Sequence, residues 1–102
     1  MAIDLSKFLK TYLEESFEGL DQAESSLLAL EPSAPDSEEI HSIFRAIHSI
    51  KGGAGTFGLS AIGGLAHSME TLLDEMRSEQ RPVDQGAVNL LLEGVDCARE
   101  LL

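Results

Sequence analysis

His48 is followed within seven residues by three glycines, in the stretch HSIKGGAGTFG (residues 48–58). Each glycine lowers the stability of a helix by about 1 kcal/mol relative to alanine, so this cluster needs a reason. Positions four and seven residues after His48 lie on its side of a helix, and they are occupied by Gly52 and Gly55. The glycines therefore leave space in which something bulky can reach the imidazole ring.

Two further polar side chains, His67 and Glu70, flank the apolar stripe of the next amphipathic segment. If the two segments pack as antiparallel neighbours, these side chains come close to His48. A carboxylate that accepts the Nδ1 proton of an imidazole fixes the tautomer and leaves Nε2 as a nucleophile. Lys51 has the charge to hold a phosphoryl oxygen. Together these residue types suit a phosphorylatable histidine.

The same residues have other interpretations. A phosphate-cradling P-loop is excluded. In that motif the lysine follows the glycines and an apolar strand precedes them, whereas here Lys51 comes before the glycines and no apolar strand precedes them. A histidine at the border of a helix is most often an ordinary surface residue, beside a solvated acid and a lysine that covers apolar surface. A metal site built from His48, His67 and Glu70 also stays open, although no cysteine and no histidine pair at i, i+4 supports it.

Four amphipathic segments with apolar residues at three- and four-residue spacing predict four helices. We expect these helices at about residues 4–30, 37–56, 60–80 and 84–102. Asp4, Asp36 and Asp84 are suitable N-caps, and Gly58 is available for a left-handed cap. Prolines interrupt the pattern in EPSAP and SEQRPVD. Helices with such short links imply an all-α, antiparallel up-down-up-down four-helix bundle.

The apolar stripes of the segments predict which side chains form the core. In the first segment the expected buried residues are Leu5, Phe8, Leu9, Tyr12, Leu13, Phe17, Leu20, Leu27 and Leu28. In the second they are Ile40, Ile43, Phe44, Ile47, Ile50 and Ala54, and in the third Ile62, Leu65, Ala66, Met69, Leu72, Leu73 and Met76. In the fourth they are Val88, Leu91, Leu92, Val95, Ala98 and Leu102.

The charge of the chain restricts its partners. Of 102 residues, 18 are acidic and 7 are Lys or Arg, which gives a net charge of −11 and disfavours nucleic acid and anionic membranes. The N-terminus has no long apolar run, so neither a signal peptide nor a membrane-spanning segment is expected. The single cysteine, Cys97, is consistent with a reducing cytoplasm. By contrast, residues 40–69 contain no acid, which indicates a surface with a separate role.

The stretch IFRAIHSIKGGAGTFGLSAIGGLAHSMETLLDEMR (residues 43–77) resembles the histidine phosphotransfer (HPt) domain at the N-terminus of the bacterial chemotaxis histidine kinase CheA. Its core is HSIKGGAGTFG, followed by HSMETLLD at the spacing of the family. The resemblance extends from the first helix through at least the third. A match of this length is specific.

The resemblance implies that His48 accepts the γ-phosphoryl group of ATP from a separate CheA-type catalytic domain, and passes it to an aspartate of a response regulator. Glu70 is then the hydrogen-bond partner of His48, and Lys51 and His67 line the site. The chain itself needs no cofactor, because ATP is used by the other domain. The family also implies a further helix after the fourth and a longer multidomain kinase, of which these residues are the N-terminal part.

Two function classes are thus expected. The first is the phosphoacceptor and relay domain of a chemotaxis-type two-component kinase, with a cytoplasmic location and no insertion into membranes. In that case response regulators are expected to dock on the acid-free face around His48. The second is a non-catalytic helical interaction module, or a metal-binding bundle, in which His48 is incidental.

Overall fold

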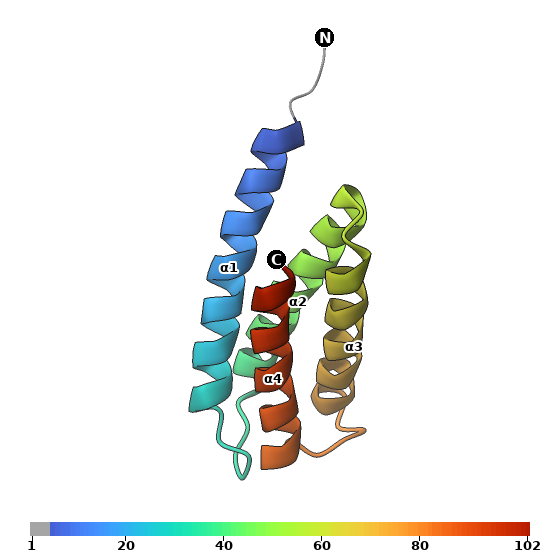
Figure 1. Ribbon diagram of the computed structural model, residues 1–102. Coiled ribbons are helices and arrows are strands. Elements are labelled where there is room, and N and C mark those ends of the chain that lie inside the picture. The colour runs from blue at the N-terminus through green and yellow to red at the C-terminus, as the bar shows by residue number, and fades with distance from the viewer. Residues whose placement is uncertain (1–4) are drawn as a thin grey trace.

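The computed structural model describes residues 5–102, and over this range the chain folds into four helices in an antiparallel bundle (Figure 1). The helices are α1 (Leu5–Ala29), α2 (Ser37–Phe57), α3 (Ser60–Arg77) and α4 (Gln85–Leu101). Each helix packs against the next, and α4 returns to pack against α1. The predicted all-α, up-down-up-down architecture is therefore confirmed. No helix within residues 5–102 combines the length and apolar character needed to span a bilayer.

Side-chain caps start two of the helices as the sequence predicts. The Asp36 carboxylate accepts the backbone N–H of Glu38 at 2.9 Å, and Asp84 accepts that of Ala87 at 2.8 Å. Each bond satisfies an amide that the first turn of a helix leaves without a partner. The third predicted cap, Asp4, lies outside the described residues.

A two-residue link joins α2 to α3. Gly58 has a φ of 68°, in the left-handed region that glycine adopts without the steric cost of a Cβ. Its backbone N–H donates to the carbonyl of Ala54, and the N–H of Leu59 donates to the same oxygen at 2.9 Å. Because the turn is so tight, α2 and α3 run side by side as an antiparallel hairpin (Figure 1).

The third helix is shorter than the sequence predicts, because it ends at Arg77 and not near residue 80. Glu79 adopts a φ of 63°, and the amides of the next two residues donate back to the carbonyl of Glu75. This left-handed turn satisfies the end of the helix. Pro82 follows, and it disfavours the helical conformation at Arg81 before it. The other helix ends agree with the prediction to within one residue.

The core runs along the axis of the bundle and draws on all four helices. Its largest fully buried side chains are Leu20, Leu27, Ile43, Ile47, Ile62, Leu73, Leu91 and Val95. The predicted stripes of α2, α3 and α4 are confirmed, with Phe44, Leu65, Leu72, Leu92 and Leu102 partly buried at their borders.

The predicted stripe of α1 is wrong in part. Leu5, Phe8, Phe17 and Leu28 are exposed, and the buried positions of the helix are Ser16, Leu20, Ala23 and Leu27. Helix α1 has 25 residues and α4 has 17, so at ~1.5 Å per residue α1 is longer by roughly 12 Å. Within the described residues, α4 lies beside the later part of α1 and not beside its first turns (Figure 1).

Candidate functional site

His48 on α2 and Glu70 on α3 meet across the hairpin, as the sequence predicts. Nδ1 of His48 lies 2.6 Å from Oε2 of Glu70. The His48 side chain is 61% exposed, whereas that of Glu70 is only 14% exposed. The carboxylate is therefore a fixed, largely covered partner, and the imidazole ring presents most of its surface to solvent.

Lys51, one turn after His48, binds the other oxygen of the same carboxylate. Its Nζ donates to Oε1 of Glu70 at 2.6 Å. Glu70 thus bridges two side chains of α2, one through each oxygen. The expectation that Lys51 lines the site agrees with this geometry, and its two remaining N–H donors suit a phosphoryl oxygen.

The surroundings of Glu70 keep it ionised. Burial opposes the charge and alone raises the pKa of the carboxyl, but the hydrogen bonds and charges of Lys51 and His48 outweigh burial, so the pKa lies below its usual value. An ionised carboxylate can only accept, so Nδ1 of His48 carries the proton in this hydrogen bond. In a neutral ring, Nε2 then holds the free lone pair, and no hydrogen bond within residues 5–102 occupies it.

The space beside His48 is open where the glycines predict it. A Cβ built at Gly52 or at Gly55 has no heavy atom within 4 Å. A side chain on a helix leans toward the preceding turn, so a larger residue at position 52 would cover the turn that carries His48. The absence of side chains here keeps the approach to the imidazole clear.

The other glycine of the cluster has a different environment. A Cβ at Gly53 would overlap the ring of Tyr12 on α1, at Cε1 and Cδ1. The Tyr12 hydroxyl donates to the carbonyl of Ile50 at 2.7 Å, and its ring lies 5.4 Å from that of Phe57. Burial raises the pKa of the Tyr12 phenol, although a hydrogen bond with Ser16 opposes the shift. Gly53 therefore serves the packing of α1 on α2 and not the access to His48.

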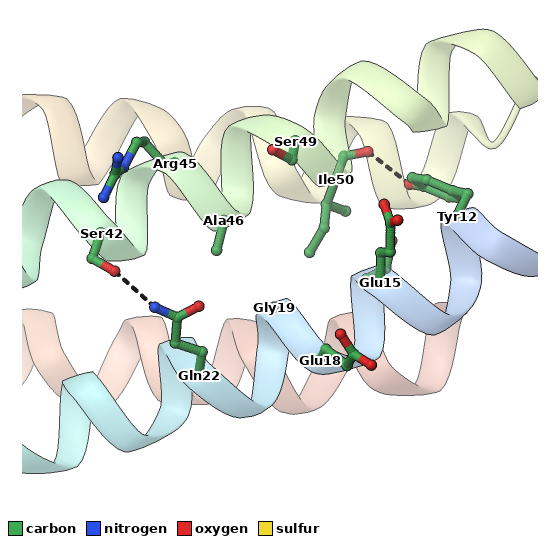
Figure 2. A pocket seen from close by; sticks show the side chains of 11 residues that line it. Tyr12, Glu15, Glu18, Gly19, Gln22, Ser42, Arg45, Ala46, Ser49 and Ile50 are labelled. Atoms are coloured by element: carbon green, nitrogen blue, oxygen red, sulfur yellow. Dashed lines mark hydrogen bonds between the residues drawn. The ribbon is translucent and has the colours of Figure 1, made fainter.

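The contact of Tyr12 closes one end of a groove between α1 and α2, shown in Figure 2. The groove has a volume of about 480 Å³ and a second hydrogen bond, from Gln22 to Ser42 at 3.0 Å, lies at its other end. None of the four predicted site residues lines it. The candidate site is thus an exposed surface, which suits a protein partner better than a small molecule.

His67, the fourth predicted site residue, is exposed on α3, and no hydrogen bond or ion pair within the described chain joins its ring to Glu70 or His48. Its place in the site stays a prediction. No three His, Cys, Asp or Glu side chains within residues 5–102 are grouped so that they could hold a metal ion. The metal alternative has no support in this part of the chain.

One contact of His48, with an aromatic ring, was not predicted from the sequence. Phe44, expected only in the core, is half-buried and stacks on the His48 ring, with centroids 5.9 Å apart and planes 9° from parallel. The guanidinium of Arg77 lies 4.1 Å from the centroid of the same phenyl ring. The signal was present, because Phe44 and His48 are four residues apart and so neighbours on one helical face.

The geometry agrees with the comparison of the whole chain with known proteins. The model of the Hpt domain family matches residues 7–100. The chain belongs to the Hpt domain family. This match covers all four helices, including both elements that carry His48 and Glu70.

Relatives of this Hpt domain include chemotaxis proteins CheA from several bacteria. It is 45% identical to that of Salmonella typhimurium over 102 residues and 33% identical to that of Bacillus subtilis over 94 residues. The alignments cover 100% and 92% of the Hpt domain but only 15% and 14% of these relatives. The chain thus spans about one seventh of the length of the proteins it resembles.

Two solved structures are similar in fold. The CheA phosphotransferase domain from Thermotoga maritima matches with a TM-score of 0.85 at 33% identity, over 93% of this chain and 90% of that one. The phosphorylated P1 domain of CheA3 in complex with CheY6, from R. sphaeroides, matches with a TM-score of 0.82 at 33% identity, over 89% of this chain and 71% of that one. The resemblance to the CheA phosphotransfer domain is therefore confirmed over nearly the whole chain.

Proposed function

We propose that this Hpt domain is the phosphoacceptor and relay domain of a CheA-type histidine kinase, and that His48 carries the phosphoryl group. The observation that carries the proposal is the 2.6 Å contact between Nδ1 of His48 and Glu70, beside the open space at Gly52. The contact sets the tautomer in which Nε2 is the nucleophile, and the open space admits a protein that delivers or removes the group.

The reaction follows from this arrangement. The Nε2 lone pair of His48 attacks the γ-phosphorus of ATP, the N–P bond forms, and the bond from phosphorus to the leaving oxygen of ADP breaks. The ring gains positive charge while Nδ1 keeps its proton, and the carboxylate of Glu70 compensates that charge. Lys51 binds an oxygen of the phosphoryl group, and His67 lines the same surface. In the reverse sense, an aspartate oxygen of the response regulator attacks the phosphorus and His48 leaves as neutral imidazole.

The domain brings no cofactor of its own to this reaction. The bundle is the substrate of a separate catalytic domain that holds ATP, and the exposed ring of His48 is suited to that role. Response regulators dock on the acid-free surface of α2 and α3, where no like charge opposes their acidic phosphorylation pocket. One similar structure is a phosphorylated P1 domain in complex with CheY6, which supports a partner of this class.

Labelling with γ-labelled ATP and a CheA catalytic domain tests the proposal. We expect label that is stable in base and lost in acid, as phosphoramidates are, and no label on His48→Gln. His41 and His67 remain in that variant, so label on it would overturn the assignment.

Glu70→Gln tests the role of the carboxylate, because the amide keeps the shape of the side chain but loses its charge. We expect the rate of phosphorylation to fall by roughly 10²-fold at most, the size of a general acid–base contribution. Glu93→Gln, which removes an exposed acid of α4, serves as the matched control and should be labelled at the wild-type rate. A wild-type rate for Glu70→Gln would show that Glu70 plays no part in the reaction.

A further inference from the structure

Two contacts restrain the His48 ring, one with Glu70 and one with Phe44. The bond to Glu70 fixes the ring at a single atom, Nδ1. A ring held at one atom can still pivot about that bond, and such a pivot swings Nε2 on the opposite side. The side chain is 61% exposed, so few other contacts oppose the motion.

The second restraint is the phenyl ring of Phe44, one turn earlier on α2. Its plane lies 9° from that of the imidazole, with the centroids 5.9 Å apart. Parallel, offset rings at this separation attract each other, and tilting one of them loses the contact. Phe44 packs against the core, so its phenyl ring is a fixed surface beside the exposed imidazole ring.

The phenyl ring of Phe44 also contacts a cation, the guanidinium of Arg77 on α3. The guanidinium of Arg77 lies 4.1 Å from the phenyl centroid, within the range of a cation–π contact. Arg77 is fixed in turn by Asp74 at 2.6 Å and by Nδ1 of His41 at 3.3 Å. His41 precedes Phe44 by three residues, so Arg77 is bonded to the turn of α2 before Phe44, whereas His48 lies on the turn after it.

We propose that Phe44, held by Arg77, is a positioning residue that sets the plane of the His48 ring and so the direction of the Nε2 lone pair. The inference rests on the proposed function of His48. Phe44 does not touch the phosphoryl group; it acts through the imidazole. Transfer requires Nε2 to point along the line of attack on phosphorus, and a displacement of about 1 Å can lower a rate by about 10²-fold. Because Phe44 restrains only one rotation of the ring, we expect its loss to lower the rate by roughly tenfold.

The test compares two substitutions at one position. Phe44→Leu keeps an apolar side chain in the core and removes the stacking, whereas Phe44→Tyr keeps the aromatic plane. With a CheA catalytic domain and ATP, we expect kcat of Phe44→Leu to fall roughly tenfold at unchanged KM. We expect kcat of Phe44→Tyr to stay within about twofold of the wild-type value. Phe17→Leu is the matched control, because it makes the same change on the outer side of α1 and should keep the wild-type kcat.

A second readout does not depend on transfer. The carbon-bound protons of the His48 ring lie beside a phenyl face, so their NMR resonances should move downfield in Phe44→Leu and stay in place in Phe44→Tyr. If Phe44→Leu folds and keeps both the wild-type kcat and the His48 resonances, the inference is wrong. A rise in KM alone would also overturn it, because that result assigns Phe44 to docking.

If Phe44→Leu fails to fold, Arg77→Met removes the outer support of the phenyl ring without touching the core. We then expect a kcat roughly threefold lower and a shift of the same His48 resonances, and no change in either contradicts the inference. Loss of this inference and loss of the proposed function are distinguishable. The function fails if the wild-type domain accepts no label or if His48→Gln still accepts it, whatever Phe44 does.

Discussion

The part of α2 that carries the glycines has two faces, and glycine has an opposite effect on each of them. On one face, Gly53 lets the ring of Tyr12 reach the backbone of α2, and a Cβ would collide with that ring. On the other, Gly52 and Gly55 have nothing within 4 Å, and the space beside His48 is left open. The cost to helix stability is similar at all three positions. On the first face that cost is offset by packing within the bundle, whereas on the second it is offset by nothing within the described chain.

The largest effect expected from this comparison is on the open face. Gly52→Leu places a side chain that leans over the turn of His48, so we expect phosphorylation by a CheA catalytic domain to slow by about 10²-fold or more. Stability should stay the same or rise, because a glycine in a helix has been replaced. Thermal unfolding and the labelling rate, measured on one preparation, check this. A normal rate would mean that the open space is not needed for access.

On the packed face the effect is on folding. Gly53→Ala forces the Tyr12 ring away, and overpacking of this kind costs about 1–3 kcal/mol, more than the roughly 1 kcal/mol that alanine adds to a helix. We expect a net loss of roughly 1 kcal/mol in the free energy of unfolding, measured with urea. In a Tyr12→Ala background the same change should become stabilising. If Gly53→Ala destabilises equally in both backgrounds, the contact with Tyr12 is not the cause.

The contributions of the two faces to the stability of the fold should be lost at opposite ends of the pH scale. The pKa of Tyr12 is raised, so its contribution is present below about pH 10.0 and is lost as the pH rises through the native pKa. The pKa of Glu70 is lowered, so its contribution is present above about pH 4.5 and is lost as the pH falls through the native pKa. Unfolding measured against pH should show a flatter alkaline limb in Tyr12→Phe and a flatter acid limb in Glu70→Gln.

Tyr12→Phe should also cost about 1 kcal/mol at neutral pH, because the hydrogen bond to Ile50 is lost. The reverse pattern would contradict this assignment. In that pattern Tyr12→Phe changes the pH dependence of unfolding on the acid side, or Glu70→Gln changes it on the alkaline side.

The smallest effect is expected at Gly55. Gly55→Ala adds a Cβ into open space, so it should stabilise the domain by about 0.5–1 kcal/mol through helix propensity alone. The sign is opposite to that of Gly53→Ala, two residues away. Urea unfolding of the two variants side by side measures the difference directly, and a destabilised Gly55→Ala would show that this face is packed after all.

Local patterns in the sequence allowed His48 and Glu70 to come close, and the resemblance to the HPt domain implied that they pair. The stripes of two adjacent helices fix which flanks can face each other, and the short link around Gly58 fixes that the helices are antiparallel. The motif then matched a known family over most of its length. Local pattern placed His48 and Glu70 on facing flanks of one hairpin, and the family motif supplied the contact between them.

The predictions that were wrong or missing depend on information that the sequence of a single helix does not contain. Periodicity shows which face of α1 is apolar, but not which helices lie beside that face along its length, so the exposure of Leu5 and Phe8 was missed. Leu28 adjoins the fully buried Leu27, and because neighbours on a helix are ~100° apart, the orientation that buries Leu27 turns Leu28 toward solvent. The cation–π contact of Arg77 with Phe44 joins two helices and depends on their register, which a pattern of residue types does not specify.

The hairpin of α2 and α3 has a consequence for the order in which the domain folds. His48 and Glu70 are 22 residues apart in sequence, whereas the ion pair of Arg99 with Asp21, which ties α4 to α1, spans 78 residues. Contacts of short sequence separation close at a smaller entropic cost and form sooner. The nucleophile and its carboxylate can therefore assemble before the bundle is closed, and a transient opening of α1 and α4 leaves them together.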